Sequence, residues 1–368
     1  MRGSNPNGIR RFWQRITDGM ALSQLWNQLH TDALFSYRLY SKEIDSRRMP
    51  GTGRIRHFFR MIQLFLWAII DKMSPARRVI LLIALILFFP SMHLTGFWTS
   101  GIFWGCILLF VLLVLEIADR VVMKRDLQIA KEIQAWLLPP GPPSVPGLEI
   151  AFATRPANTV AGDYYDVFPR PASPSPDGTY LIAIADVAGK SIPAAMLMAT
   201  YQASLKTLAG ISCSLTDLVG RMNKYACDNS QNGRRFTTTF IAEYYPTTRD
   251  LVYVNAGHNP PILRRQTGAI ERLSEGGIPL GILENAPYES GSTTLQPGDW
   301  LVIYTDGVTE AENIHQEEYG EARFMVLLYA NQTMTPPMLM NTILADIEHF
   351  VGNTPQHDDI TLMLLRAV

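Results

Sequence analysis

The chain has 368 residues and a net charge of −1, a near-neutral total that hides an uneven distribution. Residues 1–78 carry 14 Lys and Arg against 5 Asp and Glu, whereas residues 119–368 carry 18 against 27. A basic head and an acidic body argue against one uniform nucleic-acid surface, and the three cysteines, Cys106, Cys213 and Cys227, support neither a disulfide framework nor a zinc site.

Residues 1–78 form a basic N-terminal region, for which we expect an anionic membrane surface as the partner, and no nucleic acid. An apolar run over residues 61–70 follows Arg54, Arg56 and Arg60. A run of this length is too short to span about 30 Å of hydrocarbon. It therefore predicts an interfacial helix, with a buried helix of a small cytoplasmic domain as the alternative.

Two longer apolar segments predict a transmembrane hairpin over residues 79–118, with helices near 79–97 and 101–118. The short connector between them has no Lys or Arg, whereas basic residues flank the outer end of each helix. Because basic residues favour the cytoplasmic side, both termini are predicted to be cytoplasmic. The sequence thus predicts a multi-pass protein of the inner or plasma membrane.

Residues 119–138 lack Gly and Pro and predict a helical stalk that continues the second membrane helix. Val122, Ile129 and Trp136 recur at intervals of seven, the spacing of a helix that pairs with a second copy. An amphipathic helix packed on the following domain explains the pattern equally well. The proline-rich run 139–147 ends the helix and marks a domain boundary.

Residues 139–368 predict an α+β domain with mostly antiparallel sheets, because strands and helices come in separate runs rather than in strict alternation. The predicted strands cover residues 148–154, 179–186, 236–245, 250–256, 260–265, 300–305 and 360–366. The predicted helices cover residues 192–209, 214–229, 320–330 and 337–351.

Four segments of this domain place an Asp at a strand end or turn, beside Gly or another Asp. They are AGDYYD with Asp163 and Asp166, IADVAG with Asp186, IYTDGV with Asp306, and HDDIT with Asp358 and Asp359. A single Asp in such a place is more simply a turn or cap residue. Four together predict several carboxylates at one sheet edge, an arrangement that is costly unless a cation neutralises it.

An all-oxygen ligand set without His or Cys indicates Mg²⁺ or Mn²⁺ rather than zinc. Two such ions about 3.5–4 Å apart can activate a water for attack on phosphorus. The sequence has no Gly-x-Ser-x-Gly, no G-x-x-x-x-G-K-S/T phosphate loop and no His-Glu-x-x-His. His258, in NAGHNPP, is either a structural turn residue or a contact to substrate or phosphate.

From about residue 130 to the C-terminus, the sequence resembles the PPM-type metal-dependent protein phosphatases, in particular their bacterial SpoIIE/RsbU-like branch. The resemblance is carried, in order, by AKEIQAWLLPP, GDYYD, DVAGKSIPAAMLMA, RFTTTFIAEY, LVYVNAGHNPPIL, GGIPLGI, LQPGDWLVIYTDGVTEA and DDITLMLLR. It implies an αββα four-layer sandwich, here preceded by the membrane hairpin and stalk, with two Mn²⁺ or Mg²⁺ ions in a cleft at its end.

The resemblance also implies which residues hold the metal: Asp163, Asp186, the Val187 carbonyl, Asp306, Asp358 and Asp359. Asp186 and Asp306 are the central ligands, Asp163 acts through water, and Asp358 is favoured over its neighbour. Asp166 is a weaker candidate. Eukaryotic members have Asp-Gly-His where this chain has Asp-Val-Ala, so another group must protonate the leaving oxygen.

The activity implied by the resemblance is hydrolysis of phosphoserine or phosphothreonine on a regulatory phosphoprotein, with an antagonist of an anti-sigma factor as the candidate substrate. We expect a membrane-anchored homodimer that pairs through residues 119–138 and has a cytoplasmic catalytic domain. The alternative is a membrane scaffold whose phosphatase-like domain binds a phosphoprotein without turnover, against which the complete acidic set counts. A metal-dependent nucleotide cyclase also uses paired aspartates but has no other support in the sequence.

Overall fold

The computed structural model describes residues 70, 73–88, 97–170, 178–229, 235–330 and 334–368. The chain divides into two compact units, Met1–Val121 and Val122–Val368. Apart from Ile70, the predicted interfacial helix over residues 61–70 lies outside the described residues.

The described part of the first unit contains helix α4 (Pro75–Phe88) and the first part of helix α5 (Phe97–Leu137). Within the described residues, α5 is the one helix that is long and apolar enough to cross a membrane. It is unbroken from the predicted second span into the predicted stalk, as expected for a sequence without Gly or Pro at 119–138. The predicted first span is described as a helix as far as Phe88.

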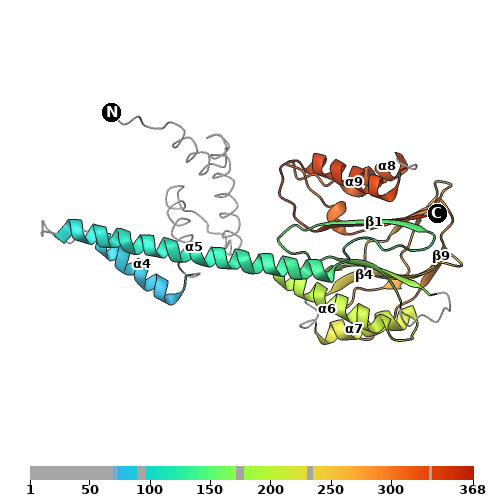
Figure 1. The fold of residues 1–368 in the computed structure, drawn as a ribbon, viewed down its shortest axis with the longest axis horizontal. Coiled ribbons are helices and arrows are strands. Elements are labelled where there is room, and N and C mark those ends of the chain that lie inside the picture. The colour runs from blue at the N-terminus through green and yellow to red at the C-terminus, as the bar shows by residue number, and fades with distance from the viewer. Residues whose placement is uncertain (1–69, 71–72, 89–96, 171–177, 230–234, 331–333) are drawn as a thin grey trace, which may run out of the picture. The chain divides into compact units, whose positions relative to one another are not determined.

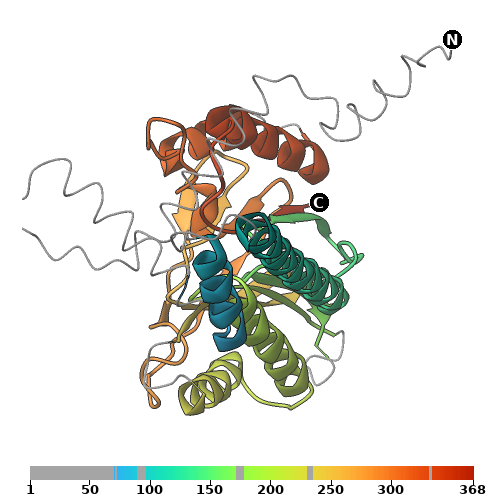
Figure 2. The same cartoon turned by 90° about the vertical axis from the view of Figure 1, so that its left-hand side faces the viewer.

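The second unit is a four-layer sandwich of helices, two sheets and helices, which Figures 1 and 2 show from two sides. One sheet has the strand order β1-β11-β10-β6-β7, and the other has the order β2-β3-β4-β5-β8 with β9 beside β5. All neighbouring strands run antiparallel except β5 and β8. This is the predicted α+β class with mostly antiparallel sheets.

The strands of the first sheet are β1 (Leu148–Arg155), β6 (Ile262–Arg264), β7 (Ile270–Arg272), β10 (Trp300–Tyr304) and β11 (Ile360–Ala367). Those of the second are β2 (Tyr164–Pro169), β3 (Tyr180–Val187), β4 (Thr237–Tyr245), β5 (Asp250–Ala256), β8 (Gly276–Gly277) and β9 (Gly291–Thr294). Helices α6 (Ile192–Ala209) and α7 (Leu215–Asp228) cover the second sheet, and α8 (Gly320–Ala330) and α9 (Pro336–Val351) cover the first.

Alternation of side chains along the strands explains the three buried layers. Ile184 in β3, Phe240 in β4 and Ile303 in β10 belong to the core between the two sheets. Residues of the opposite parity, such as Ala185 and Ile241, pack toward α6 and α7. A residue's position along its strand therefore decides whether its side chain points between the sheets or toward a helix layer.

The seven predicted strands and the four predicted helices of this unit are all present, with ends that differ by at most two residues. The prediction missed β2, β7, β8 and β9. The last three have two to four residues each and little apolar alternation, and β2 begins directly after the turn-like AGD.

Candidate metal centre

Strand ends bring the predicted acidic residues to one end of the second unit. Asp186 is the penultimate residue of β3, and Asp163 immediately precedes β2, which pairs with β3 in antiparallel fashion. Asp306 begins the short 3₁₀ helix after β10, and Asp358 and Asp359 precede β11, which pairs antiparallel with β10. Because one strand of each pair ends where its neighbour begins, the five carboxylates meet at the same edge of the sandwich.

The carboxylates of this cluster interact electrostatically. Burial raises the pKa of Asp186 to about 7, and the negative charges of Asp306, Asp358 and Asp359 add to the shift. Burial and the charge of Asp358 likewise raise the pKa of Asp306. Raised pKa values caused by burial and by like charges are expected where carboxylates are gathered without enough compensating positive charge.

Lys190 supplies positive charge to this cluster. Its Nζ lies 2.9 Å from Oδ2 of Asp358, and its charge opposes the upward pKa shifts of Asp186 and Asp306. It follows Asp186 by four residues in DVAGK, yet the sequence analysis did not single it out. One lysine does not balance the acidic side chains around it, so the cluster carries excess negative charge that a bound cation would compensate.

The residues present fit a divalent ion by the chemistry of their donors. Within the described ranges, no three His, Cys, Asp or Glu side chains already enclose an ion as they stand. The mutual pKa effects nevertheless place Asp186, Asp306 and Asp358 in one electrostatic cluster, and carboxylate oxygens are the donors that Mg²⁺ and Mn²⁺ prefer.

The structure gives Asp358 and Asp359 different surroundings. Both carboxylate oxygens of Asp359 accept main-chain hydrogen bonds, from Ala157 at 2.7 Å and from Gly162 at 2.6 Å. Asp359 thereby fixes the loop that leads to Asp163, whereas Asp358 accepts one main-chain hydrogen bond, from the Asp359 amide at 2.9 Å, and its other oxygen pairs with the flexible Lys190 side chain. This difference favours Asp358 as the ligand.

Asp163 is 2% exposed and faces the space between the sheets. The Thr305 hydroxyl donates to its Oδ2 at 3.0 Å. Burial raises its pKa well above the usual range for Asp, and the charge of Asp186 adds to the shift. The sequence analysis did not include Thr305. Leu301 and Ile303 of β10 point into the core between the sheets, and Thr305 follows them at the same two-residue spacing, one residue past the strand.

The glycine before Asp163 allows two main-chain segments to approach. A Cβ at Gly162 would lie 3.2 Å from the Val187 carbonyl oxygen and 3.1 Å from Cβ of Ala194. The Val187 carbonyl therefore lies next to the loop that carries Asp163, while the Val187 side chain is buried toward α6. Both main-chain and carboxylate oxygens are available at this edge.

Two other candidates lie apart from the cluster. Asp166 lies three residues after Asp163, so its side chain points to the opposite face of the second sheet, toward α6. Its Oδ2 pairs with Lys206 of α6 at 2.5 Å and accepts a hydrogen bond from the Tyr164 hydroxyl at 3.0 Å. These contacts indicate a structural role. His258 is 5% exposed, which argues against the option of direct contact with a substrate.

A cavity of about 320 Å³ adjoins the acidic cluster. Its lining includes Arg155, Lys190, Glu310, Glu318, His357 and Asp358. Arg155, at the end of β1, was also missed in the sequence. The cavity gives a solvent-side approach to Asp358 and brings two basic side chains near the carboxylates.

Comparisons with known proteins agree with this architecture. The family described as stage II sporulation protein E (SpoIIE) matches residues 176–368. The chain is 28% identical to protein IcfG of Synechocystis over 274 residues, which cover 67% of this chain and 42% of IcfG. It is 28% identical to the phosphoserine phosphatase RsbU of Bacillus subtilis over 245 residues, which cover 66% of this chain and 70% of RsbU.

Among solved structures, the SiaA-PP2C domain of Pseudomonas aeruginosa matches with a TM-score of 0.58 and 21% identity. The match covers 68% of this chain and 99% of that domain, and it identifies the fold as that of the PP2C phosphatases. Since the family match extends over more than half of the residues and includes Asp186, Asp306 and Asp358, the chain belongs to the SpoIIE family.

Proposed function

We propose that this chain is a membrane-anchored, metal-dependent phosphatase that hydrolyses phosphoserine or phosphothreonine on a regulatory protein. The observation that carries the proposal is the convergence of Asp186, Asp306 and Asp358 at one end of the sandwich, beside a cavity that also presents Arg155 and Lys190. Family membership supports the same reaction, because RsbU is a phosphoserine phosphatase.

Asp186, Asp306, Asp358 and the Val187 carbonyl would hold two Mn²⁺ or Mg²⁺ ions, with Asp163 acting through water. When bound, such ions supply a water of lowered pKa and neutralise charge on a phosphoryl group. The protein's own contribution is to orient the carboxylates by the main-chain bonds to Asp359 and by the Thr305 hydroxyl on Asp163. Arg155 and Lys190 would attract and orient the phosphate in the cavity.

The test is hydrolysis of p-nitrophenyl phosphate by the full chain with and without Mn²⁺. Turnover should require the ion, and Asp186→Asn and Asp306→Asn should each reduce it by about a thousandfold, because several kcal/mol of charge stabilisation are lost. Asp166→Asn is the matched control, since Asp166 comes from the same acidic set but faces α6. It should keep the metal-dependent turnover.

The scaffold alternative predicts a different outcome. A protein that binds a phosphoprotein without turnover would show no hydrolysis with any divalent ion, and its binding would survive Asp186→Asn. Metal-independent hydrolysis would also contradict the proposal. A phosphoproteome comparison of cells carrying wild type or Asp186→Asn would identify the substrate, for which an antagonist of an anti-sigma factor is our candidate.

For the membrane part, we propose a helical hairpin with both ends in the cytoplasm of the cell. Arg77, near the start of α4, pairs with Asp119 of α5 at 2.7 Å, and a Cβ at Gly101 would lie 3.4 Å from the Leu87 carbonyl. These two contacts are those of an antiparallel pair of helices. Reporter fusions at Gly96 and at the C-terminus should report opposite sides of the membrane, and the same side for both would refute the hairpin.

We further propose that residues 119–138 pair with the same segment of a second copy. Ile129, Ile133 and Trp136 are exposed apolar side chains on one face of α5, with Trp136 80% exposed. Ile133→Cys should give disulfide-linked dimers in membranes, whereas Lys131→Cys, on the opposite face, should give few. Equal cross-linking of both would contradict pairing through the predicted face.

The proposed stalk is also joined to the site. Gln134 of α5 donates to the Ala161 carbonyl at 2.7 Å and accepts from the Ala161 amide at 3.0 Å. Ala161 lies two residues before Asp163. A change in the pairing of the stalk would thus be transmitted by a short route to the loop that carries one of the proposed ligands.

A further inference from the structure

His258 lies in a place that the proposed reaction does not explain. It follows β5, its ring is buried, and its Nδ1 lies 3.1 Å from the hydroxyl of Thr238 in β4. Its Nε2 is buried without a hydrogen-bond partner of ordinary geometry. Buried polar atoms without such a partner are uncommon and call for a specific explanation.

One side of the His258 ring is connected to the strand that carries Asp186. Thr238 is the register partner of Asp186 in the β3–β4 pair, and its hydroxyl lies 3.5 Å from the Asp186 carbonyl oxygen. Thr238 has the same parity as Phe240, whose side chain is in the core between the sheets. The contact between Thr238 and His258 therefore lies in the same inter-sheet layer as the Asp186 side chain.

The other connection of His258 leads to the strand that precedes Asp306. Burial lowers the pKa of His258 to about 4, and a main-chain group of Tyr304 partly opposes that shift. Tyr304 is the last residue of β10, two residues before Asp306. The imidazole thus contacts the start of β4 in the second sheet, and His258 itself lies on the short connection from β5 of that sheet to β6 of the first sheet, which pairs with β10.

The segment that carries His258 is itself held firmly. The His258 amide donates to the Asn255 side chain at 2.8 Å, and the Asn255 amide group donates to the Leu273 carbonyl at 3.2 Å. Gly257 has a φ of 69°, and a Cβ there would lie 2.4 Å from the Pro279 ring. This tight loop fixes where the imidazole can sit between the two sheets.

We propose that His258 is a positioning residue that holds the strand ends bearing Asp186 and Asp306 at a fixed separation across the two sheets. The inference rests on the proposed function, because it assigns His258 to the preorganisation of the metal ligands. A ring that only filled space would not need a polar atom buried there, because burying such an atom without a full hydrogen bond is unfavourable.

The test compares two substitutions in the full chain. His258→Phe keeps an aromatic ring but removes both nitrogens, and Tyr201→Phe removes a similarly buried hydroxyl that contacts Thr239 at 2.5 Å. Thr239 neighbours Thr238 but faces α6, so Tyr201→Phe is a matched control on the other face of the same strand. The readouts are Mn²⁺ affinity by titration calorimetry and the temperature of unfolding in EDTA.

We expect His258→Phe to weaken Mn²⁺ binding by about tenfold to a hundredfold, the range found for residues that orient metal ligands. Tyr201→Phe should leave the Mn²⁺ affinity unchanged even if it lowers the unfolding temperature by a similar amount. His258→Asn and His258→Gln each keep a polar side chain on the loop that contacts Thr238. Each should recover part of the lost affinity, and they remain informative if His258→Phe does not fold.

The outcomes separate the two proposals. Wild-type-like Mn²⁺ affinity in all His258 variants would overturn the positioning role and leave the phosphatase proposal intact. Equal losses of Mn²⁺ affinity in His258→Phe and Tyr201→Phe would also overturn it, because the effect would then follow general stability. A wild-type chain that binds no divalent ion would instead overturn the proposed function.

Discussion

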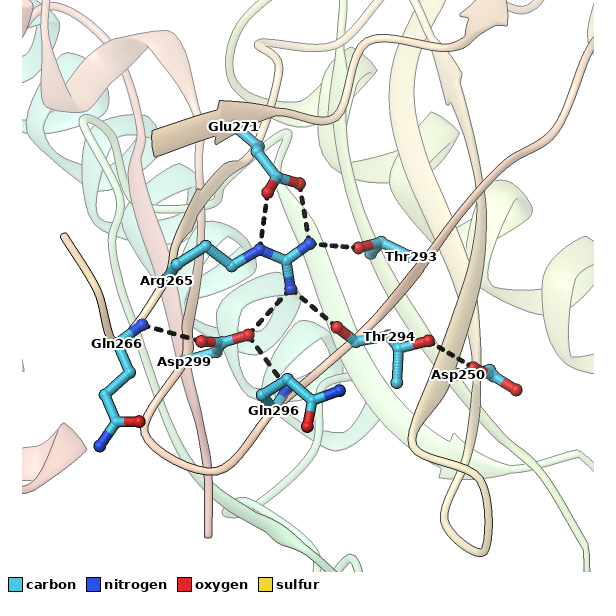
Figure 3. A network of polar contacts seen from close by, with 8 residues as sticks. All are labelled: Asp250, Arg265, Gln266, Glu271, Thr293, Thr294, Gln296 and Asp299. Carbon is cyan, nitrogen blue, oxygen red and sulfur yellow. Dashed lines mark hydrogen bonds and ion pairs between the residues drawn. The ribbon is translucent and has the colours of Figure 1, made fainter. Parts of the chain in front are cut away.

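Two buried carboxylates of the second unit, Asp299 and Asp163, are both 2% exposed, yet their surroundings are opposite. Asp299 accepts from the Arg265 guanidinium at 2.9 Å and from the main-chain amides of Gln266 and Gln296 at 2.9 and 3.0 Å (Figure 3). Asp163 instead lies among other carboxylates, and its pKa is raised well above the usual range by burial and by the charge of Asp186.

The Arg265 network also joins the two sheets. Arg265, which follows β6, forms a two-pronged ion pair with Glu271 of β7 in the first sheet, with distances of 2.7 and 2.9 Å. The same guanidinium donates to the Thr293 hydroxyl and the Thr294 carbonyl of β9 in the second sheet (Figure 3). The one guanidinium is shared between two carboxylates, and both oxygens of Asp299 accept hydrogen bonds, as expected for a region that stabilises the fold.

The contrast between Asp299 and Asp163 shows that this fold can surround a buried carboxylate with hydrogen-bond donors and an arginine. The acidic cluster around Asp186 is left with raised pKa values and one nearby lysine. Perturbed carboxylates of this kind are characteristic of functional sites, where binding of a cation replaces the missing positive charge. The two regions should therefore respond in opposite directions when a carboxylate is neutralised.

The largest expected contrast is between Asp299→Asn and Asp163→Asn, measured as the free energy of unfolding in urea with EDTA present. Asp299→Asn should cost about 1–3 kcal/mol, because it removes a buried charged acceptor from the Arg265 guanidinium and from two main-chain amides, although Glu271 still pairs with Arg265. Asp163→Asn should be neutral or stabilising under the same conditions, since it removes a negative charge from a repulsive cluster. It should also weaken Mn²⁺ binding.

A further substitution separates charge from geometry at the Arg265 network. The double variant Arg265→Met/Asp299→Asn should lose less stability than the two single losses added together, because the two side chains contact each other and each single loss already includes their shared contact. A large loss of stability in Asp163→Asn with EDTA would contradict the view that this carboxylate is uncompensated. So would equal effects of Asp163→Asn and Asp299→Asn on Mn²⁺ affinity.

The next effect is a pH dependence that belongs to the acidic cluster. Burial and neighbouring carboxylates raise the pKa of Asp186 from an ordinary value near 3.8 to about 7 in the folded protein. The folded state therefore binds this proton more tightly than the unfolded state. Its stabilising contribution is complete below about pH 4 and is lost as the pH rises through about 7, at up to about 1.4 kcal/mol per pH unit.

Urea unfolding of wild type and Asp186→Asn in EDTA between about pH 4.5 and 7.5 would isolate this contribution. The difference in stability between them should shift in favour of Asp186→Asn as the pH rises. With Mn²⁺ present the wild-type trend should reverse, because the ligands must be deprotonated to bind the ion. Parallel pH profiles of the two proteins in EDTA would contradict the raised pKa of Asp186.

Much of this comparison could be predicted from the sequence because local patterns determine it. The strands YLIAIAD and WLVIYTD each end in an Asp, and their short continuous apolar runs predict β3 and β10 within one residue of the observed ends. The helices after DVAGKS and at 337–351 were equally clear from their length and apolar spacing. These elements suffice to place acidic residues at strand ends.

Partners that are distant in sequence could not be predicted in the same way. Arg265 and Asp299 are 34 residues apart, and nothing local distinguishes them from other charged residues in β-rich segments. The parity of Asp163 and Asp166 becomes decisive only when β2 is known, and β2 was missed. For the same reason, the burial of His258 and its contact with Thr238 depend on the pairing of β4 with β5.

The smallest expected effect concerns Asp166, whose carboxylate is less fully paired than that of Asp299 but, unlike Asp163, has a lysine partner. Asp166 is buried, but it pairs with Lys206, whose side chain is 37% exposed and also lies over the Phe168 ring. Because a partly exposed lysine pair is screened by water, Lys206→Gln should cost only about 1 kcal/mol in urea unfolding. The remaining hydrogen bond from the Tyr164 hydroxyl keeps Asp166 partly satisfied.

Lys206→Gln should also leave Mn²⁺ affinity and metal-dependent hydrolysis unchanged, because Asp166 points toward α6 rather than between the sheets. Lys190→Gln is the matched lysine variant on the site side, where Nζ contacts Asp358. Its loss should alter Mn²⁺ affinity, since it removes a positive charge that competes for the same carboxylate. If the two lysine variants had the same effect on Mn²⁺ binding, the result would contradict the view that Asp166, which points toward α6, takes no part in the metal site.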